Sequence, residues 1–422
     1  MDIDGVGQMK RIRHLSRKLA KLLLGIVLSG LLIALTLFTP IGNRLLTPLV
    51  EKWLTSALAT PVTVDIFELS PSRFSLEVRD NVENTFSTQG EYSLLTVKAF
   101  GYYRIYFDHP HGINPFDTRF HSTGAFSGRY SSLDILGDIE GFGGTLTYKT
   151  QLNRLTLDSI HLNASHIEIQ ALLNLLGYPS ITSTVLDGRV DLSGFITRNV
   201  EGNIAVETHT SSFTPTPILK DSNESIDLAS LLTDDKGYIK RFTAHVSADL
   251  NLEEVGVLEQ IIGLPVRGPV KIRADLSGDQ HDLRLDGSTD LALSDSTFSI
   301  GLQRLQPQQL HFTINHARIE RLFSFLDQNA PIGGMADASG DLNLSGGNLR
   351  LNLYEGITYP KILKREYNLT QPEITFITDI SAALSRKEIH YQGTFRSNLS
   401  RFQIEGTTTH DQMLRELLNS IR

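Results

Sequence analysis

Val190-Asp191-Leu192-Ser193-Gly194 decides the fold, because near-copies of this pentapeptide recur at two later places in the chain. Ala274–Gly278 has the sequence Ala-Asp-Leu-Ser-Gly, and Leu342–Gly346 has the sequence Leu-Asn-Leu-Ser-Gly. Apolar and polar side chains alternate in each copy, as in a strand with one buried and one solvated face. The Ser-Gly pair then favours a turn. The three copies predict three β-hairpins of similar construction.

The sequence before each copy also repeats. Each time a strand pattern leads into a short helical pattern, and a proline follows because it cannot continue a helix. A Gly-containing turn and then the pentapeptide complete the unit. A repeated unit of this kind predicts an elongated array, with copies at about 155–213, 245–300 and 311–358. The expected helices are His166–Leu176, about Leu252–Ile262 and Arg318–Asp327, the prolines are Pro179, Pro265 and Pro331, and the turns are Asp187-Gly188, Arg267-Gly268 and Gly333-Gly334.

The same alternation extends over residues 60–409, with further turns expected at Ser277-Gly278-Asp279, Asp286-Gly287 and Gly346-Gly347-Asn348. Most spacers are too short for the crossover helices that parallel strands need, so the pairing should be mainly antiparallel. The predicted fold class is all-β with a few short helices. Two more helices are expected, a short one at 225–232 and a C-terminal one at 410–422.

The N-terminal region predicts a membrane anchor. Residues 22–38 form a run of 17 residues without charge, and six basic side chains precede it within residues 1–21. A transmembrane helix over 22–39 would cross most of the ~30 Å hydrocarbon core, and the basic tail would stay in the cytoplasm. The rest of the chain would then be exported. A cleaved signal peptide is the alternative, although residues 36–40 offer no good cleavage site.

Residues 40–59 have apolar side chains at helical spacing and predict an amphipathic helix. Two interpretations remain open at this point. The helix leaves the membrane surface, with Trp53 at the interface, or it packs on the first strands as a cap.

Composition excludes several classes of protein. The net charge is -8, and the basic tail holds six of the 39 basic and two of the 47 acidic side chains, so the remainder has a balance of -12. Such a body repels nucleic acid phosphates, and we expect no nucleic-acid partner. The chain has no Cys, which excludes disulfides, thiolate zinc sites and Cys nucleophiles.

Catalytic patterns are weak. Asp108-His109-Pro110-His111 is the densest group of metal-ligand residue types, but it lies in a Gly/Pro/Asn-rich stretch without a further ligand motif. No nucleophile elbow, phosphate-binding loop or dinucleotide fingerprint is present in the sequence. We therefore expect no enzyme, no cofactor and no metal.

The basic tail, the single anchor, the amphipathic segment and the hairpins ending in Leu-Ser-Gly resemble the AsmA-like family, which includes TamB-type proteins. The resemblance covers about residues 15–360. It implies a curled, taco-like repeat sheet in the bacterial periplasm, held by one inner-membrane helix with a cytoplasmic N-terminus. The implied function is a hydrophobic β-groove that shields or transfers phospholipid acyl chains in envelope biogenesis. The alternative is an assembly scaffold that works with an outer-membrane β-barrel partner.

The apolar positions of the three hairpins are the candidate groove lining. Periodicity alone favours an ordinary packed core for them, since alternation serves burial first; the resemblance favours an open groove. The residues are Leu186, Val190, Leu192, Val270, Ile272, Leu276, Leu342 and Leu344.

Overall fold

The computed structural model describes residues 36, 38–58, 60–107, 119–175, 181–214, 242–259, 265–304, 306–367, 370 and 373–409. The chain divides into two compact units. The first comprises residues 1–112 and 119–137, and the second comprises residues 113–118 and 138–422.

The first unit joins one helix to a small antiparallel sheet. Helix α2 (Pro40–Leu58) packs Val50 and Leu54 against a buried cluster of Val62, Val64 and Val78. This contact agrees with the cap interpretation for one face of the helix. The strands, each paired with the next in sequence, are β1 (Val62–Leu69), β2 (Arg73–Asp80), β3 (Thr85–Ser93), β4 (Lys98–Phe107) and β5 (Phe120–Arg129). The boundary between the units falls within β6 (Ser132–Gly141).

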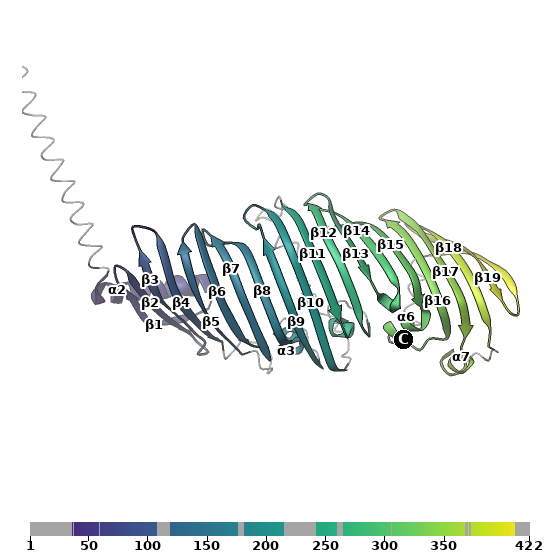
Figure 1. The fold of residues 1–422 in the computed structure, drawn as a ribbon, viewed down its shortest axis with the longest axis horizontal. Coiled ribbons are helices and arrows are strands. Elements are labelled where there is room, and N and C mark those ends of the chain that lie inside the picture. The colour runs from purple at the N-terminus through teal and green to yellow at the C-terminus, as the bar shows by residue number, and fades with distance from the viewer. Residues whose placement is uncertain are drawn as a thin grey trace, which may run out of the picture. The chain divides into compact units, whose positions relative to one another are not determined.

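The second unit is a long sheet with short helices between some of its strands (Figure 1). Its helices are α3 (Ile169–Leu175), the 3-10 turns η1 (Val255–Leu258) and η2 (Leu291–Leu293), α6 (Ile319–Phe325) and α7 (Pro360–Tyr367). Its strands are β7 (Gly144–Asn153), β8 (Thr156–Glu168), β9 (Ile181–Ser193), β10 (Asn199–Thr214), β11 (Thr243–Leu252), β12 (Val270–Asp279), β13 (Leu283–Thr289), β14 (Asp295–Gln303), β15 (Gln306–Arg318), β16 (Ile332–Asn343), β17 (Gly346–Thr358), β18 (Thr375–Ser385), β19 (Glu388–Ser397) and β20 (Arg401–Thr409).

Each strand from β7 to β20 pairs with the next, and all of these ladders are antiparallel except that of β10 with β11, which is parallel. At ~4.8 Å per strand, fourteen strands extend roughly 60 Å. Among the described residues β20 pairs only with β19, so this sheet is open at β20. The predicted all-β, mainly antiparallel class is confirmed.

The predicted repeat is present in the strand order. β8–α3–β9–β10, β11–η1–β12–β13 and β15–α6–β16–β17 each place a helical segment between two neighbouring antiparallel strands and then add a returning strand. A fourth copy, β17–α7–β18–β19, lies beyond the range in which the sequence pattern was recognised. Of the expected helices, α3 and α6 are shorter than predicted. Of residues 252–262 the structure describes 252–259, where the helical residues are those of the 3-10 turn η1 and residue 259.

Several predicted turns are wrong. Asp187-Gly188 lies inside β9 and Asp286-Gly287 inside β13. In β13 the glycine sits on the same face as a large side chain of the next strand and leaves space for it. A Cβ on Gly287 would collide with the Phe298 ring. Gly333-Gly334 lies within β16 at a β-bulge. Gly268, with φ of +90°, lies in a loop as predicted.

In the part of the chain that the structure describes, no helix combines the length and the apolar character needed to cross a bilayer. The predicted anchor at 22–39 falls outside these residues except for Thr36 and 38–39, and the predicted helices at 225–232 and 410–422 lie outside them entirely.

Candidate functional site

One face of the sheet in the second unit carries an unbroken row of uncharged residues across all fourteen strands. Paired positions in successive ladders follow this row from Tyr148 in β7 to Gly406 in β20. Neighbouring strands place such residues side by side on the same face, ~5 Å apart. The row consists of Tyr148, Leu162, Val190, Ile204, Ala248, Ala274, Gly287, Phe298, Phe312, Gly340, Leu349, Ala382, Tyr391 and Gly406.

A second row runs beside the first and lies two residues from it on every strand, always toward the same edge of the sheet. It is also free of charge, and its side chains carry hydroxyls only at its two ends. It comprises Thr150, Ile160, Leu192, Gly202, Val246, Leu276, Leu285, Ile300, Leu310, Leu342, Gly347, Leu384, Ile389 and Thr408. Together the two rows form a continuous surface, which we call the apolar face.

Most side chains of the apolar face are half-buried, not buried. Full burial is concentrated at the margin where the helical segments lie, and elsewhere in the two rows Gly340 and Ile389 are also buried. At the margin Ile169, Leu173 and Val257 form one buried cluster, and Leu252 and Val270 belong to another. Among the described residues no second sheet covers the apolar face, because all strands belong to one sheet. The closed sandwich that periodicity alone favoured is therefore not what these residues form.

Aromatic rings and glycines pair across neighbouring strands of this face. Phe312 lies where a Cβ on Gly340 would be, and Tyr391 lies where a Cβ on Gly406 would be. The rings thus lie over the backbone of the next strand, so the face stays shallow at these points. A hollow of about 590 Å³ remains over β15–β20, and its apolar lining includes Phe312, Leu351 and Ile380.

Seven of the eight candidate lining residues lie on the apolar face. Val190, Leu192, Leu276 and Leu342 lie on the half-buried part of the apolar face. Leu186, Val270 and Ile272 lie on the same face at the helical margin, where Val270 is fully buried and the other two pack against the buried clusters.

Leu344 is misplaced in the prediction. Alternation from Leu342 put its side chain on the apolar face, but β16 ends at Asn343 and the chain turns there. Leu344 occupies this turn and is 66% exposed. The sequence pattern also missed the lining contributed by β18–β20, because the fourth copy was not recognised; Ile380, Ile389, Tyr391 and Ile404 are its members.

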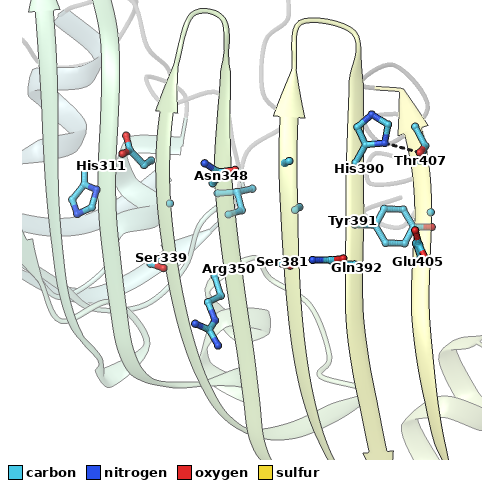
Figure 2. Close-up of a pocket in the computed structure, with 16 residues that line it drawn as sticks. His311, Ser339, Asn348, Arg350, Ser381, His390, Tyr391, Gln392, Glu405 and Thr407 are labelled. Carbon is cyan, nitrogen blue, oxygen red and sulfur yellow. Dashed lines mark hydrogen bonds between the residues drawn. The ribbon is translucent and has the colours of Figure 1, made fainter.

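The opposite face is polar and charged. A hollow of about 770 Å³ lies on its β15–β20 part. Figure 2 shows His311, Arg350 and His390 of its lining around small side chains such as Ser339 and Ser381. His390 Nδ1 lies 2.8 Å from Thr407 Oγ1, and Arg350 Nη2 donates to Asp379 Oδ2 at 2.9 Å. These groups satisfy one another across strands, as on a solvated sheet surface.

Hydrogen bonds tune the carboxylates of the polar face. The His161 ring, 2.8 Å from Asp191, and then the Arg189 guanidinium lower the pKa of Asp191. Hydrogen bonds from Ser299 and then Arg284 lower the pKa of Asp286. Both carboxylates therefore favour their charged form, which increases the contrast in polarity between the two faces of the sheet.

Within the described residues no group of three or more His, Asp or Glu side chains is placed to hold a metal ion. Asp108–His111, the cluster considered from sequence, lies outside them.

Comparison of the chain with protein-family models, with curated proteins and with solved structures finds no match.

Proposed function

We propose that the protein is an inner-membrane-anchored periplasmic protein of the AsmA-like kind, whose curled sheet forms a groove that shields or transfers lipid acyl chains. The membrane placement rests on the uncharged run at 22–38 and the basic residues before it. Membrane phospholipids are the proposed ligands.

The observation that carries the proposal is the apolar face, which continues without a charge over fourteen paired strands and is only half-buried. An ordinary core has no reason to stay uncovered at its centre. Continuous exposed apolar surface of this extent marks a binding site. Each acyl CH₂ that the face removes from water contributes about 0.8 kcal/mol, and the gain is the same at each point along the face. Such a lining therefore holds a chain without fixing its position.

Native mass spectrometry of the full chain, extracted in mild detergent, tests lipid binding. We expect phospholipid to remain bound to the protein, and lipid extraction should recover it after detergent exchange. Protein that is free of lipid under conditions that retain lipid on a control lipid-binding protein would contradict the proposal.

Substitutions locate the site. Leu276→Asp and Leu351→Asp place a charge on the half-buried face, where desolvation of a carboxylate is costly, and should lower bound lipid about tenfold or more. Leu344→Asp is the matched control, because it introduces the same change in an exposed turn of the same unit. If the two face variants unfold while the control does not, these leucines belong to a packed core. If they fold and retain lipid, the site lies elsewhere.

The free edge of the sheet favours a second candidate, a scaffold for an outer-membrane β-barrel protein. Strand β20 presents an edge among the described residues, and edges of this kind accept strands from partners. A column of stacked rings leads to this edge: Phe376 and Phe395 are 5.3 Å apart, and Phe395 and Phe402 are 4.8 Å apart. A photo-cross-linker at Gln403 should capture a barrel protein if this candidate is right, and lipid alone if it is not.

A further inference from the structure

Helix α2 has two apolar faces, and the β-sheet covers only one of them. Its inner face packs through Val50 and Leu54 onto the Val62 cluster. Four large apolar side chains, at intervals of four residues, point away from the sheet: Ile41 is 73% exposed, Leu45 70%, Leu49 63% and Trp53 67%. In a helix this interval keeps the side chains on one side, where they form a continuous stripe.

The charged residues of α2 next to the stripe are basic. Arg44 and Lys52 are both exposed, Lys52 within the stripe and Arg44 at its edge, where it also lines a hollow with Asp65 and Glu68 of β1. The one acidic residue of α2, Glu51, accepts a hydrogen bond from the Val64 backbone N–H at 3.3 Å, so its carboxylate is directed to the sheet. An apolar stripe whose charged neighbours within the helix are basic is complementary to a surface that is apolar inside and anionic outside.

The position of the helix in the chain also points to a lipid bilayer as the surface that α2 meets. The uncharged run of residues 22–38 ends two residues before α2 begins at Pro40. If that run crosses a bilayer, α2 starts at the level of the lipid headgroups. Tryptophan and the long basic side chains are enriched at that level, because their polar ends reach water while their apolar parts stay in the lipid.

We infer that the outer face of α2, comprising Ile41, Leu45, Leu49 and Trp53 with Arg44 and Lys52, docks on the surface of an anionic lipid bilayer. The helix then lies in the interface with its stripe in the acyl boundary and its basic groups at the phosphates. The inner face holds β1 and β2 beside that surface through the Val62 cluster. This docking does not depend on lipid binding by the apolar face of the second unit.

Trp53 makes the test direct, since it is the only tryptophan of the protein. The full chain is reconstituted into phosphatidylcholine vesicles that contain phosphatidylglycerol, with and without brominated acyl chains. We expect blue-shifted indole emission that the brominated lipid quenches and that aqueous acrylamide quenches weakly. Emission of a water-exposed indole, readily quenched by acrylamide, overturns the inference. Blue-shifted emission without quenching by brominated lipid also overturns it, because protein then covers the stripe.

Variants test whether the stripe of α2, and not the general hydrophobicity of the protein, makes the contact with lipid. Leu45→Ser combined with Leu49→Ser should lower the quenching by brominated lipid at least about twofold, since two of the four apolar side chains of the stripe are lost. Arg44→Glu combined with Lys52→Glu should lower it specifically in vesicles that contain the anionic lipid. The matched control is Leu95→Ser, which removes a 97% exposed leucine outside α2 and should change nothing. Equal effects of the control and the stripe variants would contradict the inference.

Discussion

Arg267 and Glu259 form a buried ion pair in the second unit. Arg267 Nη1 lies 2.6 Å from Glu259 Oε2, and the two side chains are 14% and 3% exposed. The guanidinium also lies over the Phe213 ring at 5.1 Å, and the Arg267 backbone N–H donates to the Phe325 carbonyl oxygen. One arginine thus ties the β10 end, the η1 segment and the α6 end together.

Removal of the carboxylate should destabilise this junction strongly. Glu259→Gln leaves the guanidinium largely buried, with Asp327, 3.8 Å away, as its one ionic partner among the described residues. We expect a loss of about 3 kcal/mol in the free energy of unfolding of this unit, measured by urea denaturation. Asp249→Asn is the control, because its pair with Arg273 is exposed and should contribute less than about 1 kcal/mol. Equal losses for both variants would mean that burial of the pair is unimportant.

The pKa of Asp191 predicts a dependence of stability on pH. Because folding lowers this pKa, the charged carboxylate stabilises the fold at pH values above the ordinary aspartate range. That stabilisation is lost as the pH falls through the lowered pKa. His161→Ala removes the largest cause of the shift, so its denaturation midpoint should lie below that of the unmodified protein near pH 6, and this difference should shrink as the pH falls through the lowered pKa of Asp191. His311→Ala, on the same face, should show no such pH-dependent difference.

At the scale of elements, the first and third copies of the repeat share a β-bulge at the strand end before the helix. His166 and His316 have positive φ there, and the ladder register shifts beside each of them. The His166 backbone N–H donates to Asp187 Oδ1 at 3.0 Å, and that of His316 donates to Asp337 Oδ1 at 2.7 Å. The carboxylate thus satisfies the amide that the bulge removes from the ladder.

Loss of this carboxylate should weaken the element. Asp337→Ala leaves the His316 amide without its partner and should cost about 1–2 kcal/mol of stability. Thermal unfolding, together with hydrogen exchange at residues 314–319, measures the effect locally. Asp341→Ala is the matched control on the same strand and face, since Asp341 makes no such bond among the described residues. A change no larger than that of the control would show that the bulge needs no cap.

Sequence patterns predicted the repeat because alternation and the Leu-Ser-Gly ending depend on neighbours within one strand. They failed where long-range packing decides the backbone. Gly287 occupies a strand because the Phe298 ring needs its space, and sequence spacing alone does not contain that contact. The bulges at His166 and His316 were not predicted either, because non-glycine residues seldom adopt positive φ.

The fourth copy departs from the pattern at one residue. Its strand β18 ends in Leu384-Ser385 followed by Arg386, where the other copies have glycine. Its helix α7 begins at Pro360, a position that proline tolerates well, and Pro372 follows the helix as Pro179, Pro265 and Pro331 follow the other three. A search for Leu-Ser at the end of an alternating strand, without the glycine, would have found it.

At the scale of the whole molecule, the apolar face matters as a path and not as a set of separate sites. Its rows pass through every strand from β7 to β20, including the parallel pair of β10 and β11, where the meander is interrupted. Parallel pairing keeps facing residues on one side of the sheet as antiparallel pairing does, so Ile204 and Ala248 continue the row. The interruption in chain order therefore leaves the surface unbroken.

A charge at the middle of the path distinguishes transfer from storage. Leu285→Asp places a carboxylate on the apolar face of β13, between β9 and β20. Photo-cross-linkers are placed at Val190 and at Ile404, and vesicles supply labelled phospholipid. We expect capture of the phospholipid to persist at one of the two positions and to fall about tenfold at the other, because a buried charge raises the barrier to sliding. The position that keeps its lipid lies on the side where lipid enters. Ser288→Asp, which adds the same charge to the exposed face of the same strand, should leave both captures intact. If lipid still reaches both positions in the Leu285→Asp protein, the copies bind lipid independently and the face is not a path.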